Sequence, residues 1–551
     1  MSGMSTSVAL WLGAGAASTV WLAAGWRWLA RLLHMLQQEG YHRRYFVRWV
    51  LRAGRRHQAV FMLAVFLPLL ATGLYAGRWT AWLALVGLVA WGVVGLYWSL
   101  RFRAPPAKQP LRWTPKAILL ATLVCLLVAL VTAALSVVGF QVDGAAGGAM
   151  GLSFGLAAGL ALLPAFLLAA TLLAWPAQAV REAMLLRAAR RKLRASSARV
   201  IGITGSYGKT STKEFVSTLL AARYRVLKTP KSYNTPLGIA RVLLRDLRPD
   251  HDYVVVELGA YGPGEIGRLC RLVTPYIGVL TAIGPQHLER FGSIERIAAA
   301  KYELIESLPA DGVAVFNADD PRCRSLAAQT AGLVIRYSVH EPPRIDVDLA
   351  AVQVEHSQRG ASFTLRDRDG ARQPVAVELL GLTNVSNVLA AAAVAQYCGL
   401  SLAEIASAAR RIQPIPHRLQ PIDGAGGVLV IDDAYNSNPV GAAAALSVLD
   451  TVPGRRKLLV TPGMVELGER HEAEHEALGR RAAQVCDTVV LVGPRRTAPI
   501  LAGLRAAAFP SERVVVVTTL AEATERLATL LGPGDVVLFE NDLPDTYDEA
   551  A

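Results

Sequence analysis

Residues 200–214 read VIGITGSYGKTSTKE, and this stretch decides the fold. A short β-branched run leads into a turn that contains Gly205 and Gly208, and a helical run follows. The glycines let the backbone curl so that several N–H groups face one anion, and the helix N-terminus adds positive potential. Lys209 can reach the outer phosphates of a nucleotide, and the Thr210 hydroxyl can bind Mg²⁺. The stretch therefore predicts a nucleoside triphosphate site, with ATP as the nucleotide.

The residues after this turn alternate short apolar, β-branched runs with helical stretches. Continuous apolar strands separated by helices indicate a parallel sheet that is covered on both faces. The predicted strands are 200–204, 253–257, 277–281, 313–316, 428–432, 457–461, 488–492 and 513–518. We place a boundary between two α/β domains near Gln413. Residues 200–413 are predicted as a P-loop-type parallel-sheet domain that binds ATP, and residues 414–551 as a smaller, Rossmann-like α/β domain.

The charge of the chain is divided unevenly along its length. The formal net charge is +14 over 551 residues, but residues 1–199 carry +18 and the remainder carries −4. The basic excess therefore lies in the hydrophobic N-terminal part, where it indicates membrane topology rather than a surface for phosphate backbones. A nucleic-acid partner is not expected. The five scattered cysteines form no CxxC pair, which argues against a zinc knuckle or a disulfide scaffold.

Residues 1–180 read as a membrane region. A helix needs about 20 mostly apolar residues to cross a bilayer. About five stretches qualify, near residues 7–30, 59–77, 80–100, 117–140 and 149–175. Basic residues are concentrated in alternate loops and in a basic linker at 181–199, which is a positive-inside pattern. We therefore expect a multi-pass protein of the inner (cell) membrane, with its N-terminus outside and its linker and α/β domains in the cytoplasm.

The predicted spans contain almost no ionisable residues, which disfavours a transporter or pump because such proteins usually carry charges within the bilayer. The arginine-rich loops could bind anionic lipid head groups, including a polyprenyl pyrophosphate. A solvated flank of a positive-inside topology explains them equally well. The lipid bilayer is the partner that the N-terminal part predicts.

Further polar side chains follow the predicted strands of the α/β part. Glu257 ends the second apolar run, where a carboxylate lies beside the nucleotide crevice and can hold a metal ion. His287 follows the next run, and Lys301 falls on the helical stretch after it. A histidine in such a position is, taken alone, more often structural than a ligand.

An ordered set of motifs gives these residues a more specific meaning. The stretches are TGSYGKTSTKE, YNTPLGIARVLL, VVELGA, PQHLERFGS, AKYELI, FNADDP, TNVSNVLAAAA, PHRLQPI, IDDAYNSNP and GMVELGERHEAEHEALG. Together they resemble the Mur ligase family, from about Val200 to about Val537. Members of this family join amino acids or peptides to a cell-wall precursor. The DDAYNSNP stretch is similar to the branch that adds D-alanyl-D-alanine to a muramoyl-tripeptide.

The resemblance implies an ATP-dependent amide ligase of peptidoglycan synthesis that acts through an acyl phosphate. By motif, Lys209 would contact the β- and γ-phosphates, Thr210 and Glu257 would bind a first Mg²⁺, and His287 would help to bind a second. Lys301 occupies the place of the family's carbamylated lysine. Lys209, Lys301 and His287 are thus the expected catalytic residues.

The remaining site residues are also carried over by motif. The nucleotide side would comprise Gly205, Gly208, Ser211, Asn384, Asn387, Arg418 and Asp433, with the two asparagines at the adenine and the last two residues at the phosphate and ribose. The substrate side would comprise Asn234, Thr235, Tyr435, Asn436 and Asn438. His471 and His475 have the spacing of a helical metal pair, but we interpret both as structural.

The chain also departs from the family. Membrane spans stand where soluble relatives have a small domain that binds UDP, and Thr383 replaces a usual histidine. Residues 539–546 read FENDLPDT where relatives of this branch tend to show Lys-Gly-Ser-Arg. The acceptor could therefore be a UDP-linked or lipid-linked muropeptide or another envelope polymer, and the amine could be D-alanyl-D-alanine or another one. A non-catalytic scaffold and an ATP-driven transporter are the other hypotheses. The sequence does not predict an oligomeric state.

Overall fold

The structure is a computed structural model, and it describes residues 2–38, 40–51, 81–101, 110–230, 233–286, 288–340, 346–435, 437–465 and 467–543. The chain divides into two compact units between Arg181 and Glu182. The first unit is helical, and the second contains two β-sheets, each covered by helices. Each unit is described below by itself.

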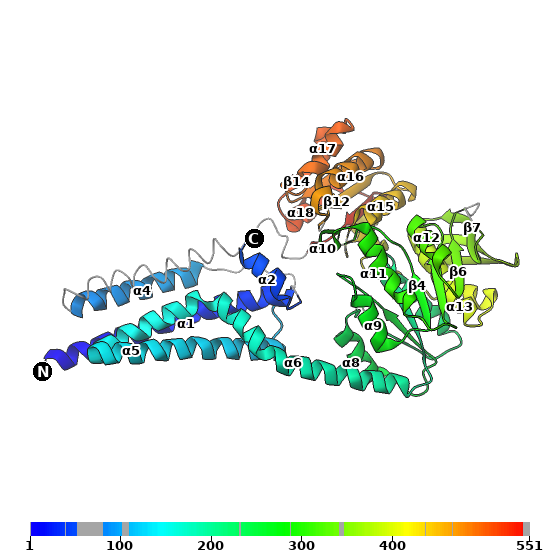
Figure 1. Cartoon of the computed structure of the whole chain (residues 1–551). Helices are drawn as coiled ribbons and strands as arrows, with labels where there is room; N and C mark the ends of the chain where they lie inside the picture. The colour runs from blue at the N-terminus through cyan, green and yellow to red at the C-terminus, as the bar shows by residue number, and fades with distance from the viewer. Residues whose placement is uncertain are drawn as a thin grey trace. The chain divides into compact units, whose positions relative to one another are not determined.

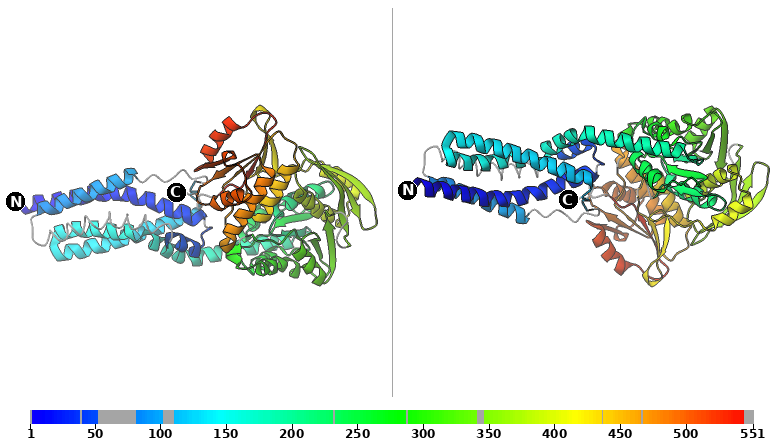
Figure 2. Two further views of the ribbon diagram at one scale, coloured as in Figure 1. Left: turned by 90° about the horizontal axis from the view of Figure 1, so that it is seen from above. Right: turned by 90° about the horizontal axis from the view of Figure 1, so that it is seen from below.

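The first unit is built from long apolar helices that lie side by side (Figures 1 and 2). Its helices are α1 (Ser2–Gln38), α2 (Arg43–Trp49), α4 (Ala81–Arg101), α5 (Pro115–Ala161) and the first part of α6 (Leu163–Arg194). Trp21 of α1 stacks on Trp91 of α4 with ring centroids 5.7 Å apart. The Trp21 indole N–H also donates to the Trp91 carbonyl oxygen at 2.9 Å, so a polar atom buried between the helices is satisfied.

Helix α5 is a hairpin of two helical segments. Gly144 lies in the left-handed region (φ +55°), and the Ser136 hydroxyl donates to the Gly148 carbonyl oxygen at 3.0 Å. A Cβ atom at Gly151 would lie 2.2 Å from the Leu135 carbonyl oxygen, so the two segments touch backbone to backbone. Glycines four residues apart allow this approach, as in close helix packing within membranes. They are Gly147, Gly151, Gly155 and Gly159.

The described helices agree only partly with the predicted spans. Three are long and apolar enough to cross a bilayer by length and composition, namely Val8–Gln38, Pro115–Val142 and Leu163–Arg194. Shorter apolar helices cover Leu85–Tyr97 and Gly147–Ala161. The expected span 59–77 lies outside the described residues. The expected span 149–175 is divided at Leu162, because Pro164 begins a new helix in its first turn, where proline is favoured.

The larger sheet of the second unit has nine strands in the order β2-β3-β1-β4-β5-β6-β7-β8-β9. Pairing is parallel from β2 to β7 and antiparallel from β7 to β9. The strands are β1 (Arg199–Thr204), β2 (Val226–Lys228), β3 (Tyr253–Glu257), β4 (Ile277–Leu280), β5 (Val313–Asn317), β6 (Leu333–Ser338), β7 (Leu349–His356), β8 (Ala361–Asp367) and β9 (Arg372–Val377). Because β1 lies between β3 and β4 and is parallel to both, the turn that follows it opens beside the carboxyl ends of these two strands.

Helices cover both faces of this sheet, which explains its continuous apolar strands. One face packs against α7 (Lys209–Leu220), α13 (Leu382–Tyr397) and α14 (Leu402–Ala409). The other packs against α8 (Pro236–Asp246), α9 (Glu265–Val273), α11 (Ile294–Glu306), α12 (Pro321–Gln329) and the end of α6. The short helix α10 (Leu288–Phe291) precedes α11. The alanine-rich stretch of α13 is buried, and its small side chains bring α13 close to α7.

The smaller sheet has six strands in the order β10-β11-β15-β12-β13-β14, all parallel except for the β10–β11 pair. The strands are β10 (Gln420–Asp423), β11 (Leu429–Asp433), β12 (Lys457–Thr461), β13 (Thr488–Val492), β14 (Val514–Val517) and β15 (Val536–Glu540). Helices α15 (Pro439–Thr451), α16 (His471–Val485) and α17 (Ala498–Ala506) cover one face, and α18 (Leu520–Leu530) covers the other. The predicted fold class, a helical region followed by two α/β domains, is confirmed.

Candidate functional site

The turn after β1 has the conformation that its glycines predict. Gly205 has φ +151° and Gly208 has φ +77°, and Gly208 is the residue that precedes α7. A Cβ atom at Gly205 would lie 2.0 Å from the Thr281 hydroxyl, and one at Gly208 would lie 2.3 Å from Asn387 Oδ1. Both positions therefore require glycine for space as well as for backbone conformation. The N-terminus of α7 opens into a cleft that contains the other candidate residues.

Lys209 folds back over the turn. Its Nζ donates to the carbonyl oxygens of Gly205 at 2.7 Å and Ser206 at 3.2 Å, and it lies 3.4 Å from Gln286 Oε1. Burial lowers the pKa of Lys209 to about 8, although the nearby Glu257 carboxylate opposes this shift. The backbone carbonyl oxygens hold the ammonium group beside the helix N-terminus, where an anion would also be attracted.

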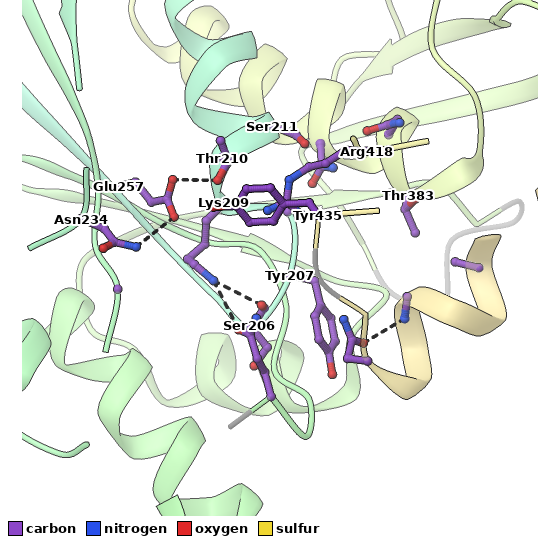
Figure 3. A pocket seen from close by; sticks show the side chains of 18 of the residues that line it. Ser206, Tyr207, Lys209, Thr210, Ser211, Asn234, Glu257, Thr383, Arg418 and Tyr435 are labelled. Atoms are coloured by element: carbon purple, nitrogen blue, oxygen red, sulfur yellow. Dashed lines mark hydrogen bonds between the residues drawn. The ribbon is translucent and has the colours of Figure 1, made fainter. Parts of the chain in front are cut away.

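Thr210 and Glu257 form a pair of oxygen ligands at the mouth of the turn. The Thr210 hydroxyl donates to Glu257 Oε2 at 2.8 Å, and Asn234 Nδ2 lies 3.4 Å from Glu257 Oε1 (Figure 3). Glu257 is buried at the carboxyl end of β3. The described residues contain no cluster of three or more His, Cys, Asp or Glu side chains placed to hold a metal ion. One carboxylate and one hydroxyl beside a phosphate turn nevertheless suit Mg²⁺, which usually completes its shell with water and substrate phosphate oxygens.

Lys301 lies in the same cleft, on α11, and only 2% of its surface is exposed. Burial, followed by repulsion from Lys209, holds the pKa of Lys301 well below its usual value, while Glu257 opposes the shift. The lowered pKa increases the share of the neutral amine relative to the ammonium ion. A neutral amine is nucleophilic, so the site suits a lysine that is chemically modified.

Helix α13 closes one side of the cleft. Asn387 Oδ1 accepts a hydrogen bond from the Thr212 hydroxyl at 3.2 Å, which joins α13 to α7. Asn384 Nδ2 donates to the Leu380 carbonyl oxygen at 2.9 Å. Thr383, which stands where the family usually has histidine, lines the cleft as well.

The smaller sheet provides the opposite wall. The Arg418 guanidinium lies over the Tyr435 ring, 4.3 Å from its centroid. Arg418 is flanked by two non-glycine residues in the left-handed region, His417 (φ +62°) and Leu419 (φ +46°). The Leu419 N–H donates to Asp433 Oδ1 at 3.1 Å, which helps to fix this conformation. Burial raises the pKa of Asp433 to about 6, although the Leu419 N–H and the Arg418 charge oppose the shift.

The structure brings most of the predicted site residues together. The cleft is lined by Gly208, Lys209, Thr210, Ser211, Asn234, Glu257, Lys301, Asn384, Asn387, Arg418, Asp433, Tyr435 and Asn438. Gly205 and Thr235 are not among the described residues that line the cleft. Gly205 contributes its carbonyl oxygen to Lys209, and the Thr235 hydroxyl accepts from Gly238 N at 3.3 Å and caps α8. His287 and Asn436 lie outside the described residues.

Sequence reasoning missed several residues of the cleft. Tyr207 and Gln286 both line it, and each stands next to a residue that the motifs had singled out. The sequence offered one signal for them: Tyr207 is next to Gly208 of the glycine turn, and Gln286 is next to His287. The interpretation of His475 as structural is confirmed, because Nε2 accepts from Met464 N at 2.8 Å and Nδ1 lies 2.7 Å from the His471 carbonyl oxygen. Neither ring nitrogen of His475 is then available to a metal ion.

Comparisons with known proteins agree with this arrangement. Residues 203–395 match the Mur ligase middle domain, and residues 417–540 match the Mur ligase, glutamate ligase domain. The chain is 37% identical over 362 residues to the UDP-N-acetylmuramoyl-tripeptide–D-alanyl-D-alanine ligase of Mycobacterium tuberculosis, covering 62% of this chain and 70% of the relative.

Two solved structures are similar as well. MurF from Acinetobacter baumannii is 30% identical with a TM-score of 0.59, covering 67% of this chain and 79% of that one. MurF ligase from Thermotoga maritima, in complex with ADP, is 29% identical with a TM-score of 0.58, covering 66% of this chain and 80% of that one. This chain therefore belongs to the Mur ligase family of ATP-dependent ligases that form peptide bonds.

Proposed function

We propose that this protein adds D-alanyl-D-alanine to a muramoyl-tripeptide acceptor in peptidoglycan precursor synthesis. One observation carries the proposal: a single cleft holds Lys209, Glu257 and Lys301 from the larger sheet's side and Asp433 and Tyr435 from the smaller sheet's side. The printed function of the Mycobacterium tuberculosis relative, D-alanyl-D-alanine ligation, supports the choice of amine and acceptor.

ATP would bind with its phosphates on the turn at Gly205–Ser211 and the N-terminus of α7. Lys209 would balance the charge of the outer phosphates, and Asn384 and Asn387 would lie on the adenine side. Arg418 and Asp433 would contact the phosphate and the ribose. The N-terminus of α7 and the cations Lys209 and Arg418 line the cleft and suit a polyanion.

Thr210 and Glu257 would hold Mg²⁺, since they offer neighbouring oxygen atoms beside the phosphate turn. His287 would contribute to a second Mg²⁺. When bound, these ions would neutralise the charge that crowds around the transferred phosphoryl group.

The chemistry comprises two transfers. The acceptor carboxylate attacks the γ-phosphorus of ATP, so that an acyl phosphate forms and ADP leaves. The uncharged amine of D-alanyl-D-alanine then attacks the acyl carbon, the C–O bond to phosphate breaks, and the amide forms. The amine nitrogen loses one proton to solvent or to the departing phosphate and keeps the other as the amide N–H. The chain's role is to align the reacting groups and balance their charges.

Lys301 would act as a carbamate. Its uncharged amine would add to CO₂ and release one proton, which converts a neutral group into an anion. The depressed pKa of Lys301 supports this reaction, because only the neutral amine is a nucleophile. An anionic group at this position could approach Mg²⁺, whereas an ammonium ion would be repelled.

The acceptor would bind near Asn234, Thr235, Tyr435, Asn436 and Asn438. Its carrier could be UDP or a membrane lipid, and the three long apolar helices support the lipid alternative. These helices also support an inner-membrane anchor. The basic residues of the linker 181–199 support the orientation in which the N-terminus is outside and the catalytic unit is in the cytoplasm.

The test is mass spectrometry of the products formed by the full chain in detergent micelles. The protein would receive Mg-ATP, D-alanyl-D-alanine and either UDP-linked or lipid-linked muramoyl-tripeptide. We expect a pentapeptide product together with one ADP and one phosphate per amide. Product from the lipid-linked acceptor alone would assign the helices a part in substrate binding. Absence of product from both acceptors, with ADP still bound, would overturn the D-alanyl-D-alanine assignment but not the family.

A further inference from the structure

Two acidic residues lie side by side at the ends of adjacent strands in the smaller sheet. Asp433 of β11 and Glu540 of β15 are directly paired in the parallel register. Paired residues of neighbouring strands direct their side chains to the same face of a sheet, so the two carboxyl groups are neighbours. Asp433 lines the cleft, whereas Glu540 lies behind it with 1% of its surface exposed.

The two oxygens of Glu540 have different surroundings. The Ser437 hydroxyl donates to Oε1. Oε2 is buried, and among the described residues it accepts no hydrogen bond. A carboxylate oxygen buried without a donor is costly, whereas a protonated carboxyl oxygen is itself a donor and needs only an acceptor. The Asp433 carboxyl group interacts directly with Glu540 and can be that acceptor.

Among the described residues, the charges that act on Glu540 do not include a cation. Besides Glu540, Arg418 and Asp432 are the charged groups that influence the pKa of Asp433, and the Asp432 carboxylate is 2.7 Å from His417 Nδ1. The side of Glu540 is formed by Ser437 and Asn541, and Asn541 Nδ2 donates to the Gly463 carbonyl oxygen at 2.6 Å. Two carboxylates in contact without a cation between them cannot both ionise at low cost.

We propose that Glu540 is a positioning residue that stays protonated at neutral pH and donates a hydrogen bond to Asp433, which holds the Asp433 carboxylate toward the nucleotide ribose. The inference rests on the proposed nucleotide role of Asp433. It assigns a function to the departure of residues 539–546 from the pattern of related ligases. A neutral carboxyl group here supplies a hydrogen-bond donor without adding positive charge behind the nucleotide.

The direction of the two pKa shifts agrees with this arrangement. Burial, and then the neighbouring Asp433, raise the pKa of Glu540 well above its usual range. The pKa of Asp433 is raised only to about 6, and the Glu540 hydrogen bond acts to lower it. Both shifts have the direction that one proton held by Glu540 requires.

The test compares E540Q and E540L in the full chain in detergent micelles, by calorimetric titration with Mg-ADP between pH 5 and 8. For the unmodified protein we expect ADP affinity to fall about tenfold per pH unit below pH 6, as Asp433 gains a proton. E540Q keeps a donor. It should retain the ADP affinity at neutral pH and the midpoint pH at which the affinity begins to fall. E540L removes the donor, so the midpoint should move to higher pH and the affinity at pH 7 should fall by about tenfold.

A different pattern would overturn the inference. If Glu540 were ionised, E540Q would remove a negative charge beside Asp433, and both the affinity and the midpoint would shift in favour of binding. If E540L binds ADP as the unmodified protein does, Glu540 has no positioning role.

An infrared band of a protonated carboxyl group at pH 7, present in the unmodified protein and lost in E540Q, provides a readout without nucleotide. If the unmodified protein bound no ADP, the proposed function would fail, and the infrared band would still decide the protonation of Glu540. Thermal unfolding of both variants checks that they fold.

Discussion

The Thr210 hydroxyl donates a 2.8 Å hydrogen bond to Glu257, and this bond joins the first turn of α7 to the carboxyl end of β3. The bond thus holds the phosphate turn against the end of β3. Thr210 and Glu257 would hold Mg²⁺ here through their oxygen atoms, and the ion would balance phosphate charge.

We expect E257Q to lower the rate of amide formation by at least about 10²-fold, because a neutral amide cannot balance the charge of Mg²⁺ in the cleft. Rates would be measured by mass spectrometry of the product over a range of Mg²⁺ concentrations. The matched control is E378Q, since Glu378 is exposed at the end of β9, away from the cleft. Equal activity of E257Q and E378Q would contradict a metal-binding role for Glu257.

We expect K301A to be inactive and to regain part of its activity when a short carboxylate such as acetate or formate is added. The small anion would occupy the space of the truncated side chain and replace the negative charge of the carbamate. K301R, which fills the same space with a permanent cation, should not be rescued. The measurement is amide formation as a function of carboxylate concentration. Rescue of K301A by ethylammonium rather than by carboxylates would indicate that the lysine acts as a cation.

The pH dependence of nucleotide binding should report the pKa of Lys209. This pKa is lowered to about 8, so the side chain is an ammonium ion below pH 8 and a neutral amine above it. We expect ADP affinity to decline as the pH rises above 8, because the neutral amine no longer attracts phosphate. K209R should remain charged throughout this range and show a flatter profile. A decline of the same size in K209R would assign the titration to another group.

Replacing Gly151 by leucine should destabilise the α5 hairpin. The new Cβ would lie 2.2 Å from the Leu135 carbonyl oxygen, so the two segments must separate. We expect a loss of about 1–3 kcal/mol, as overpacking in a well-packed interior usually costs. The matched control is G15L in α1, where the space for a Cβ is open. Thermal unfolding in detergent would compare the variants, and equal melting of G151L and G15L would refute the packing argument.

Asp535 should contribute to stability down to low pH. Burial alone would raise the pKa of Asp535, but hydrogen bonds from Arg456 and Arg455 outweigh it and hold this pKa well below its usual range. We expect D535N to destabilise the protein by about 1–3 kcal/mol at neutral pH.

Because a depressed carboxyl pKa contributes stability that is lost as the pH falls through its folded value, the difference from D535N should close only in strong acid. Denaturant unfolding at several pH values would measure the difference in free energy of unfolding between the unmodified protein and D535N. D423N, which removes an exposed ion pair with Arg359, is the control and should change stability little.

The parts of the fold that sequence predicted are those with strong local signals. Buried strands such as β1, β3 and β12 are continuous apolar runs, and their period and length indicate a parallel sheet. Strands β7, β8 and β9 were missed, because their ends mix exposed polar residues with apolar ones and they pair as an antiparallel extension. Strand β2 has only three residues, which is too short for any periodic signal.

The site was predictable where a motif carried it and not where strand order created it. Lys209 and Thr210 follow from the spacing of the glycine turn alone. Glu540 could not be predicted as a neighbour of Asp433, because 106 residues separate the two strands' ends and only the order β11-β15 brings them together. Tyr207 lies inside the predicted turn, yet its burial in the cleft depends on contacts from segments that are distant in sequence.

The strained backbone around Arg418 has a pharmacological consequence. His417 and Leu419 hold left-handed torsions that leucine and histidine adopt at a cost, and the Asp433 carboxyl group helps to keep them. A small molecule that bound this connecting segment and let it relax would withdraw the arginine from the cleft. Because Arg418 would contact the nucleotide, such a compound and ATP would weaken each other's binding by the same factor. Relaxation of the connection between the two sheets would therefore lower nucleotide affinity without occupying the phosphate turn.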